Sequence, residues 1–176
     1  MKNLLFTLML MALTSATLSA YTFEVDGIYY WFLNSNEVMV TRNPDAIDED
    51  GLYSGDIIIP ETILYNGNTY SVTQIGDYAF YGSSGMTSIY IPNSITSIGR
   101  QAFWGCTGLT SINIPNSVTY IGSAAFNECS GLISVNLPNS FTHIYEDMFY
   151  SCSSLTSIII PDSVTHIHYL AFAGCI

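Results

Sequence analysis

Hydrophobic and polar positions recur with a constant period of about 23 residues through the second half of the chain. Each copy begins with a hydrophobic residue, alternates hydrophobic with polar residues as far as a proline, and continues to a phenylalanine and a cysteine. The copies occupy residues 86–108, 109–131 and 132–154, followed by 155–176, which stops just short of a full copy, and preceded by a degenerate copy at 63–85. A single unit cannot bury its hydrophobic side chains alone, so the pattern predicts coils that stack on one another.

The spacing within a copy predicts two short strands and a bend. The first strand directs its hydrophobic side chains inward and its Ser and Asn side chains outward. A proline ends this strand in each copy, because proline has no N–H for the strand ladder: Pro92, Pro115, Pro138 and Pro161. Val118 and Ile121 predict a second extended segment, and the Ala125-Phe126 pair predicts a bend with short helical pieces. A period of this length indicates a leucine-rich repeat solenoid, built mostly of short β-strands and turns.

One phenylalanine and one cysteine of each copy fall in inward columns of the predicted coils. The core residues expected there are Phe103, Cys106, Phe126, Cys129, Phe149, Cys152, Phe172 and Cys175. Cysteines at the same repeat position point the same way, which suits disulfide geometry poorly. Buried free thiols are therefore favoured over two disulfides, although export would permit disulfides. Zinc is less favoured still, because no C-x-x-C spacing occurs.

The repeat L-x-x-I-x-I-P-x-S-V-T-x-I-x-x-x-A-F-x-x-C resembles the BspA-like leucine-rich repeat, a bacterial surface-antigen type. The resemblance covers about residues 63–176, and the run from Ile112 to Cys129 carries it most specifically. A proline after the strand and the absence of the usual asparagine ladder separate this type from other leucine-rich repeats. The resemblance implies export to the cell surface or beyond, and adhesion to host matrix or other cells in some members.

Residues 21–62 lack the repeat and predict a small β-rich N-terminal cap over the open end of the solenoid. Asp26-Gly27 is a hairpin turn signal between two segments of alternating pattern. Further strands are predicted at 37–41 and 56–59, and an Asn-Gly turn at Asn66. At the other end the chain stops without a polar capping coil, which suggests a fragment, a truncated gene product or an end covered by a partner.

Residues 1–20 have the pattern of a secretory signal peptide: Lys2, a hydrophobic run over 4–13 and small residues up to Ala20. The hydrophobic run is too short for a membrane span, so no membrane insertion is expected after cleavage. Removal of residues 1–20 leaves Arg42 and Arg100 against 14 acidic residues, a formal charge of −12. This balance disfavours nucleic acid and anionic lipid as partners.

The sequence gives only weak support for metal-binding or catalytic sites. His143 and His166 share one column, with His168 close by, and an exposed polar ladder is favoured there over a metal site. The acids Asp45, Asp48, Glu49 and Asp50 do not have the spacing of a calcium loop and are expected to form a solvated loop. Nucleophile elbows, H-E-x-x-H motifs and phosphate-binding glycine loops are absent, so no enzyme and no cofactor are predicted.

Uncharged aromatic and amide side chains on the outer positions of the repeats are the expected ligand-binding surface. They are Tyr90, Trp104, Asn113, Tyr120, Asn136, His143 and His166. The predicted function is that of a secreted or cell-surface binding and adhesion module that recognises an extracellular-matrix or cell-surface protein. Two alternatives stay open: a glycan-binding module on the same scaffold, and the recognition part of a larger hydrolase.

Overall fold

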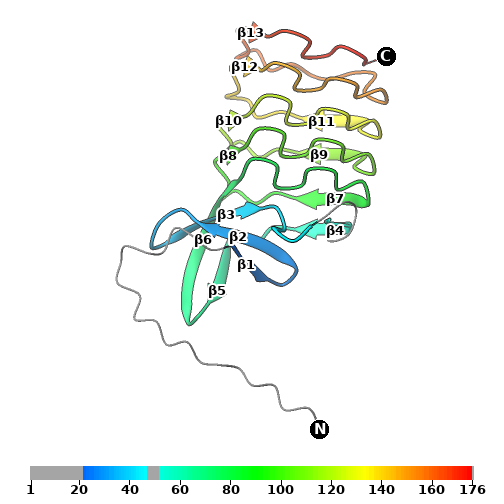
Figure 1. The fold of residues 1–176 in the computed structure, drawn as a ribbon. Helices are drawn as coiled ribbons and strands as arrows, with labels where there is room; N and C mark the ends of the chain where they lie inside the picture. Colours follow the sequence, from blue (N-terminus) through cyan, green and yellow to red (C-terminus); the bar gives the residue numbers. More distant parts are fainter. Residues whose placement is uncertain (1–21, 47–51, 176) are drawn as a thin grey trace.

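The computed structural model describes residues 22–46 and 52–175, so the predicted signal peptide and Asp48, Glu49 and Asp50 lie outside the described residues. A small β-rich part at the N-terminal side leads into a ladder of coils (Figure 1). Across the described ranges all regular elements are strands, and none is a helix long and apolar enough to span a membrane. The bends, expected to include helical pieces, are turns.

Two hairpins form most of the N-terminal part. Its strands are β1 (Thr22–Val25), β2 (Ile28–Phe32), β3 (Glu37–Thr41), β5 (Thr62–Tyr65) and β6 (Asn68–Ile75). The β1–β2 turn has Asp26 and Gly27 at φ 51° and 80°, and the β5–β6 turn has Asn66 and Gly67 at 49° and 79°. Positive φ at both central residues is what a two-residue turn between twisted strands requires, as the sequence predicts.

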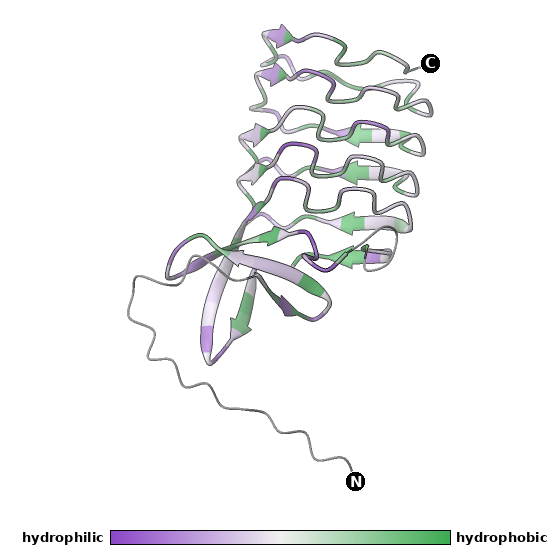
Figure 2. Cartoon of the chain, viewed as in Figure 1, coloured by the Kyte–Doolittle hydropathy of each residue, from purple (hydrophilic) through white to green (hydrophobic). Residues whose placement is uncertain are grey.

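Two stacks of parallel strands run along the solenoid, on opposite sides of the coils in Figure 1. One continues from β3 and β6 into β8 (Ser97–Ile98) and β10 (Tyr120–Ile121), with β12 (His143–Ile144) and β13 (His166–Ile167) as a separate pair further along. The other contains β4 (Gly55–Ile58), β7 (Met86–Tyr90), β9 (Ser111–Asn113) and β11 (Ser134–Asn136). In Figure 2 hydrophobic residues mark β7, β9 and β11, whereas β12 and β13 each begin with a hydrophilic histidine.

Strand β4 links the cap to the repeats. It lies within the range 21–62 yet pairs in parallel with β7, with Ile57 opposite Ile89 and Ile58 opposite Tyr90. The run from Ile57 to Pro60, which begins in β4 and continues past its end, has the I-x-I-P pattern of the repeat. The distance along the chain from β4 to β7 is longer than one repeat period. The β5–β6 hairpin, which lies between these two strands along the chain, accounts for the extra length. Strand β4 therefore takes the place of a first repeat strand.

Stacked phenylalanines form the centre of the coils. The rings of Phe80, Phe103, Phe126, Phe149 and Phe172 follow one another at centroid distances of 5.2, 5.3, 5.5 and 5.4 Å, with interplanar angles of 9° or less. In each bend the second residue before the phenylalanine has positive φ, as at Gln101 (52°) and Ala124 (54°). This left-handed residue interrupts a right-handed helical path, which explains why the bends are turns.

Candidate binding surface

The predicted surface residues lie on three different surfaces of the solenoid. Tyr90, Asn113 and Asn136 belong to the β7–β9–β11 stack, and Tyr120, His143 and His166 to the β10, β12 and β13 side. Trp104 lies on a bend between the two. They therefore do not form one continuous binding surface, and each group is described in turn.

On the β7–β9–β11 stack, two asparagines bind each other. The Asn136 Nδ2 donates a hydrogen bond of 2.7 Å to the Asn113 Oδ1 of the preceding coil. Tyr90 lies exposed before them and Ile159 after them in the same column. Because the two amides partly satisfy each other, this column offers a ligand fewer hydrogen-bonding groups.

At the bend, Trp104 packs edge-on against Tyr81 with ring centroids 5.3 Å apart. The Arg42 guanidinium lies 6.0 Å from the centroid of the Tyr81 ring, and that of Arg100 lies 5.3 Å from the Tyr78 ring. Arg100 also donates a hydrogen bond to the Tyr78 hydroxyl. These are the only Arg or Lys residues of the described chain, and both are engaged with aromatic rings.

The β10, β12 and β13 side carries a stack of rings, here called the histidine–tyrosine ladder. His143 and His166 stack at 4.7 Å with an interplanar angle of 3°. Tyr145 lies 5.7 Å from Tyr120 and 5.5 Å from His168, so it joins the two ends of the ladder. The five members are Tyr120, His143, Tyr145, His166 and His168.

Glycines explain why this ladder starts where it does. The repeat position of Tyr145 and His168 is occupied by Gly76, Gly99 and Gly122 in the earlier coils. A Cβ on Gly99 would collide with the backbone nitrogen of Asp77, and one on Gly122 would lie 2.6 Å from that of Arg100. At Gly99 and Gly122 the coils are therefore packed too closely for a side chain.

Where Tyr145 replaces glycine, the strand ladder opens. The Gly122 N–H donates to the Ile98 carbonyl and the His168 N–H to the Ile144 carbonyl, both at 2.9 Å. The described backbone contacts include no equivalent bond from Tyr145, and β10 does not pair with β12. Hydrogen bonds continue across the same two coils at the bend, where the Phe126 N–H donates to the Met148 carbonyl at 3.0 Å. The gap in the backbone hydrogen bonds is therefore confined to the side of the coils that carries the histidine–tyrosine ladder.

A groove of about 450 Å³ runs along the earlier coils on this side and ends at the Tyr120 ring. Gly76 and Gly99 leave its floor without side chains, and Met39 of β3 closes the other end. Together the groove and the ladder form a concave floor beside a wall of rings. A strip of backbone, mostly uncharged side chains and the single carboxylate of Asp77, bordered by aromatic rings, has the chemistry of a recognition surface.

The histidines of the ladder are placed for stacking rather than for metal binding. The Nδ1 atoms of His143 and His166 each lie 2.9 Å from the hydroxyl of the preceding threonine, Thr142 and Thr165. Face-to-face rings direct their nitrogens side by side instead of toward one point. Among residues 22–46 and 52–175, no group of three or more His, Cys, Asp or Glu side chains is arranged to hold a metal ion.

The cysteine column is buried and carries free thiols. Cys106, Cys129 and Cys152 are fully buried, and each Sγ donates to the carbonyl of the phenylalanine one coil back, at 3.0 to 3.1 Å. Burial raises the pKa of the Cys106 and Cys152 thiols to about 12 and that of Cys129 well above its ordinary value. Phe172 and Cys175 are half-buried, because they lie in the last described coil.

The predicted surface residues did not include most of the groove lining or two ladder members; Met39, Tyr145 and His168 illustrate why. The signal for the last two is visible in the repeat alignment, where a tyrosine and a histidine replace glycine at one position. Met39 carries no repeat signal, because it lies in the cap and reaches the groove through the parallel pairing of β3 with β6. Only the three-dimensional pairing brings it there.

Comparison with known proteins places these features in a wider group. The sequence matches the BspA type leucine-rich repeat region in six copies over residues 60–176. The leucine-rich repeat protein of T. pallidum shares 28% identity, with a TM-score of 0.72 over 88% of this chain and 68% of that one. A leucine-rich cell surface protein of Faecalibacterium prausnitzii shares 27%, with a TM-score of 0.65 over 89% of this chain and 47% of that one.

A leucine-rich repeat protein of Bacteroides capillosus shares 25% identity, with a TM-score of 0.58 over 84% of this chain and 97% of that one. This chain thus spans about half of the F. prausnitzii protein and nearly all of the B. capillosus protein. A comparison with curated protein sequences finds no match.

Proposed function

Because this chain belongs to the BspA-type leucine-rich repeat family, we propose that it is an exported, non-catalytic module that binds a protein at a cell or host surface. The binding surface is the groove over β6, β8 and β10 together with the histidine–tyrosine ladder. A cell surface protein of F. prausnitzii with the same repeat architecture supports this location. No cofactor is involved.

The observation that carries this proposal is the histidine–tyrosine ladder beside a groove whose floor has glycine at Gly76 and Gly99. Tyr120 is 48% exposed although it is a large aromatic residue, and it stands at the junction of groove and ladder. Exposed aromatic rings in a preformed array contribute large contact areas at a low cost in side-chain entropy. Residues 62–176 carry five acids and one arginine, so the partner need not be basic.

A glycan is the second candidate, favoured by the neighbouring Tyr120 and Tyr145 rings 5.7 Å apart. A panel of purified extracellular-matrix proteins and a glycan array, probed with the same labelled protein, separate the two classes. Recognition of matrix proteins supports the first proposal, and binding confined to glycans replaces it with the second.

The surface itself is tested by replacing Tyr120, His143 and His166 together with alanine. We expect at least about a tenfold loss of affinity for the captured partner, because interface aromatics commonly contribute that much. The matched control replaces Tyr90, Asn113 and Asn136 with alanine on the opposite stack. Equal losses in the two variants, or none in the first, would remove the groove and ladder from the proposal.

Export is tested separately. The full chain, expressed with its own N-terminus in a bacterial host, should appear outside the cytoplasm and begin at Tyr21 by mass spectrometry. An intact N-terminus on cytoplasmic protein would contradict export, without bearing on the binding surface.

A further inference from the structure

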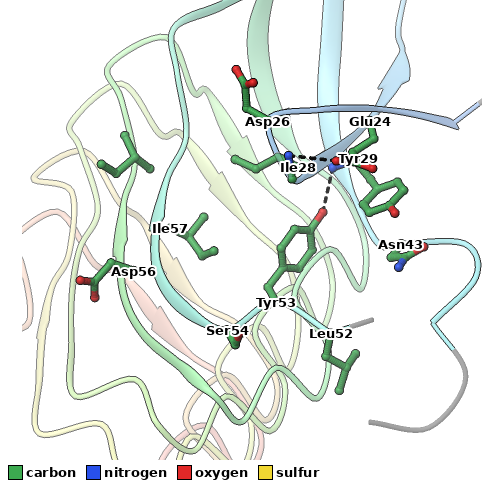
Figure 3. A pocket seen from close by; sticks show the side chains of 12 residues that line it. Glu24, Asp26, Ile28, Tyr29, Asn43, Leu52, Tyr53, Ser54, Asp56 and Ile57 are labelled. Atoms are coloured by element: carbon green, nitrogen blue, oxygen red, sulfur yellow. Dashed lines mark hydrogen bonds between the residues drawn. The ribbon is translucent and has the colours of Figure 1, made fainter. Parts of the chain in front are cut away.

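A separate cleft lies in the N-terminal part, between the β1–β2 hairpin and strand β4 (Figure 3). We propose that this cleft docks an extended, lysine- or arginine-containing peptide segment of a partner protein, which adds as a strand to the free edge of β4. This site goes beyond the proposed function, because it lies away from the groove and the ladder and selects its ligand by charge.

The cleft is preformed and has an apolar floor. Its volume is about 580 Å³, and Ile28, Ile57 and Tyr53 contribute apolar surface to it. The Tyr53 hydroxyl donates to the Thr41 carbonyl at 2.9 Å and accepts a hydrogen bond from the Tyr29 N–H at 3.0 Å. These two bonds tie the segment before β4 to strands β2 and β3, so the floor is held in place without a ligand.

One edge of β4 has no partner strand in the described structure. The N–H groups of Gly55 and Ile59 donate toward the β7 side, to the carbonyls of Gly85 and Tyr90. Since backbone groups alternate along a strand, those of Asp56 and Ile58 point to the other edge, toward the cleft. An edge with free N–H and C=O groups is the site at which an extended peptide adds by main-chain hydrogen bonding.

All the charged residues that line the rim of the cleft are acidic. Glu24 and Asp26 lie on the hairpin side and Asp56 on the β4 side, and no lysine or arginine is among the described residues that line the cleft. The Asp56 carboxylate accepts hydrogen bonds from Ser88 at 2.6 Å and Thr87 at 2.8 Å, which lower its pKa and keep it ionised. Charge complementarity therefore favours a basic segment.

Alternation along β4 also determines the expected ligand pattern. Asp56 and Ile58 project to the same side, and Ile58 is 69% exposed. A peptide strand paired with β4 would place a basic side chain beside Asp56 and an aliphatic one beside Ile58. A second opening of about 270 Å³ shares Asp26, Ile28 and Ile58 with the cleft and is lined mostly by apolar residues, so it extends the apolar contact.

The test uses the whole chain and fluorescence anisotropy of a labelled peptide, Ac-Lys-Thr-Val-Val-Lys-Gly, in which a lysine and a valine two positions apart lie on one face of the extended peptide. We expect saturable binding that weakens at least about tenfold between about 50 and 500 mM NaCl, because salt screens the rim charges. A peptide with glutamate in place of each lysine should not bind. A peptide N-methylated at its valines should bind at least about tenfold more weakly, because it lacks N–H donors for the β4 edge.

Variants assign the contact to the cleft. Glu24→Gln with Asp56→Asn should weaken peptide binding by at least about tenfold, whereas Asp162→Asn, an exposed carboxylate in the last described coil, should not. Ile58→Pro blocks the free edge without removing a bond to β7 and should abolish binding, with circular dichroism confirming the fold. The Tyr120, His143 and His166 alanine variant should bind the peptide normally, which separates this site from the proposed function.

Three results would overturn the proposal. The first is no saturable binding of the lysine peptide, and the second is unchanged affinity in either cleft variant. The third is that spermine or the N-methylated peptide binds as tightly as the lysine peptide, which would indicate a charge-only contact without strand addition.

Discussion

The column of buried thiols should make the protein lose stability in mild alkali. Cys106, Cys129 and Cys152 are fully buried, and burial raises their thiol pKa values from an ordinary value of 9.0, to about 12 for the first and the last. Between these pH values a folded chain keeps protons that an unfolded chain releases. Stability is therefore fully present below pH 9 and falls as the pH rises toward 12.

The magnitude follows from proton linkage. At pH 10 each thiol with an unfolded pKa near 9 lowers the free energy of unfolding by about 1.4 kcal/mol, so three lower it by about 4 kcal/mol. Burial also raises the pKa values of Tyr30 and Tyr53, which adds a further loss above pH 10. A variant that lacks the three thiols but keeps these tyrosines therefore isolates the loss of unfolding free energy that is due to the thiols.

Urea unfolding at pH 8 and pH 10 with a phosphine reductant measures this difference. Serine replaces all three cysteines in the comparison variant, because Ser83 already occupies the same column, fully buried, in the first coil. Each serine can donate to the carbonyl that now accepts from the thiol. We expect the natural protein to lose about 4 kcal/mol more than the variant between the two pH values. Equal losses would refute buried, protonated thiols.

The remaining predictions concern the backbone of the repeats. Glu128 has φ 59° where three other copies have glycine, so Glu128→Gly should raise the free energy of unfolding by about 0.5 to 1 kcal/mol in urea, and Glu128→Ala should not. A Cβ on Gly131 would collide with the Thr107 carbonyl oxygen, so Gly131→Ala should lower the urea midpoint by an amount equivalent to about 2 kcal/mol or more; an unchanged midpoint would contradict the close packing. By hydrogen exchange, the amide of Tyr145 should exchange faster than those of Gly122 and His168, and equal protection would mean that the strand ladder is closed there.

Much of the fold could be predicted because the same pattern of hydrophobic and polar positions recurs in every copy of the repeat. A side chain needed inside one coil is needed inside the next, so the phenylalanine and cysteine columns appear directly in the alignment. Turns that require positive φ at two residues are equally visible, since Asp26-Gly27 and Asn66-Gly67 are among the few pairs that adopt it readily. The membership of strand β4 in the solenoid was less visible, because a hairpin insertion lengthens its distance along the chain from β7.

The bends were predicted less well than the strands. Hydrophobic spacing around the Ala-Phe pair is compatible with a helical turn or with an irregular one. The left-handed residue that decides between them is Tyr78, Gln101, Ala124, Asp147 or Leu170, and the run of residue types at this position gives no consistent signal of positive φ. Contacts between successive coils hold it there, as when the Gln101 N–H donates to the Ser123 carbonyl at 3.1 Å.

The sequence by itself determined which residues share a column, because a constant repeat period places equivalent side chains one above another. Which columns share a surface was decided only by the tertiary path of each coil, which sends its two strands to opposite sides and separates Asn113 from Tyr120. The groove depends on parallel pairing of β3 with β6, and the charged cleft on the approach of the β1–β2 hairpin to β4. Both sites join residues that no local pattern connects, since pairing between distant segments creates them.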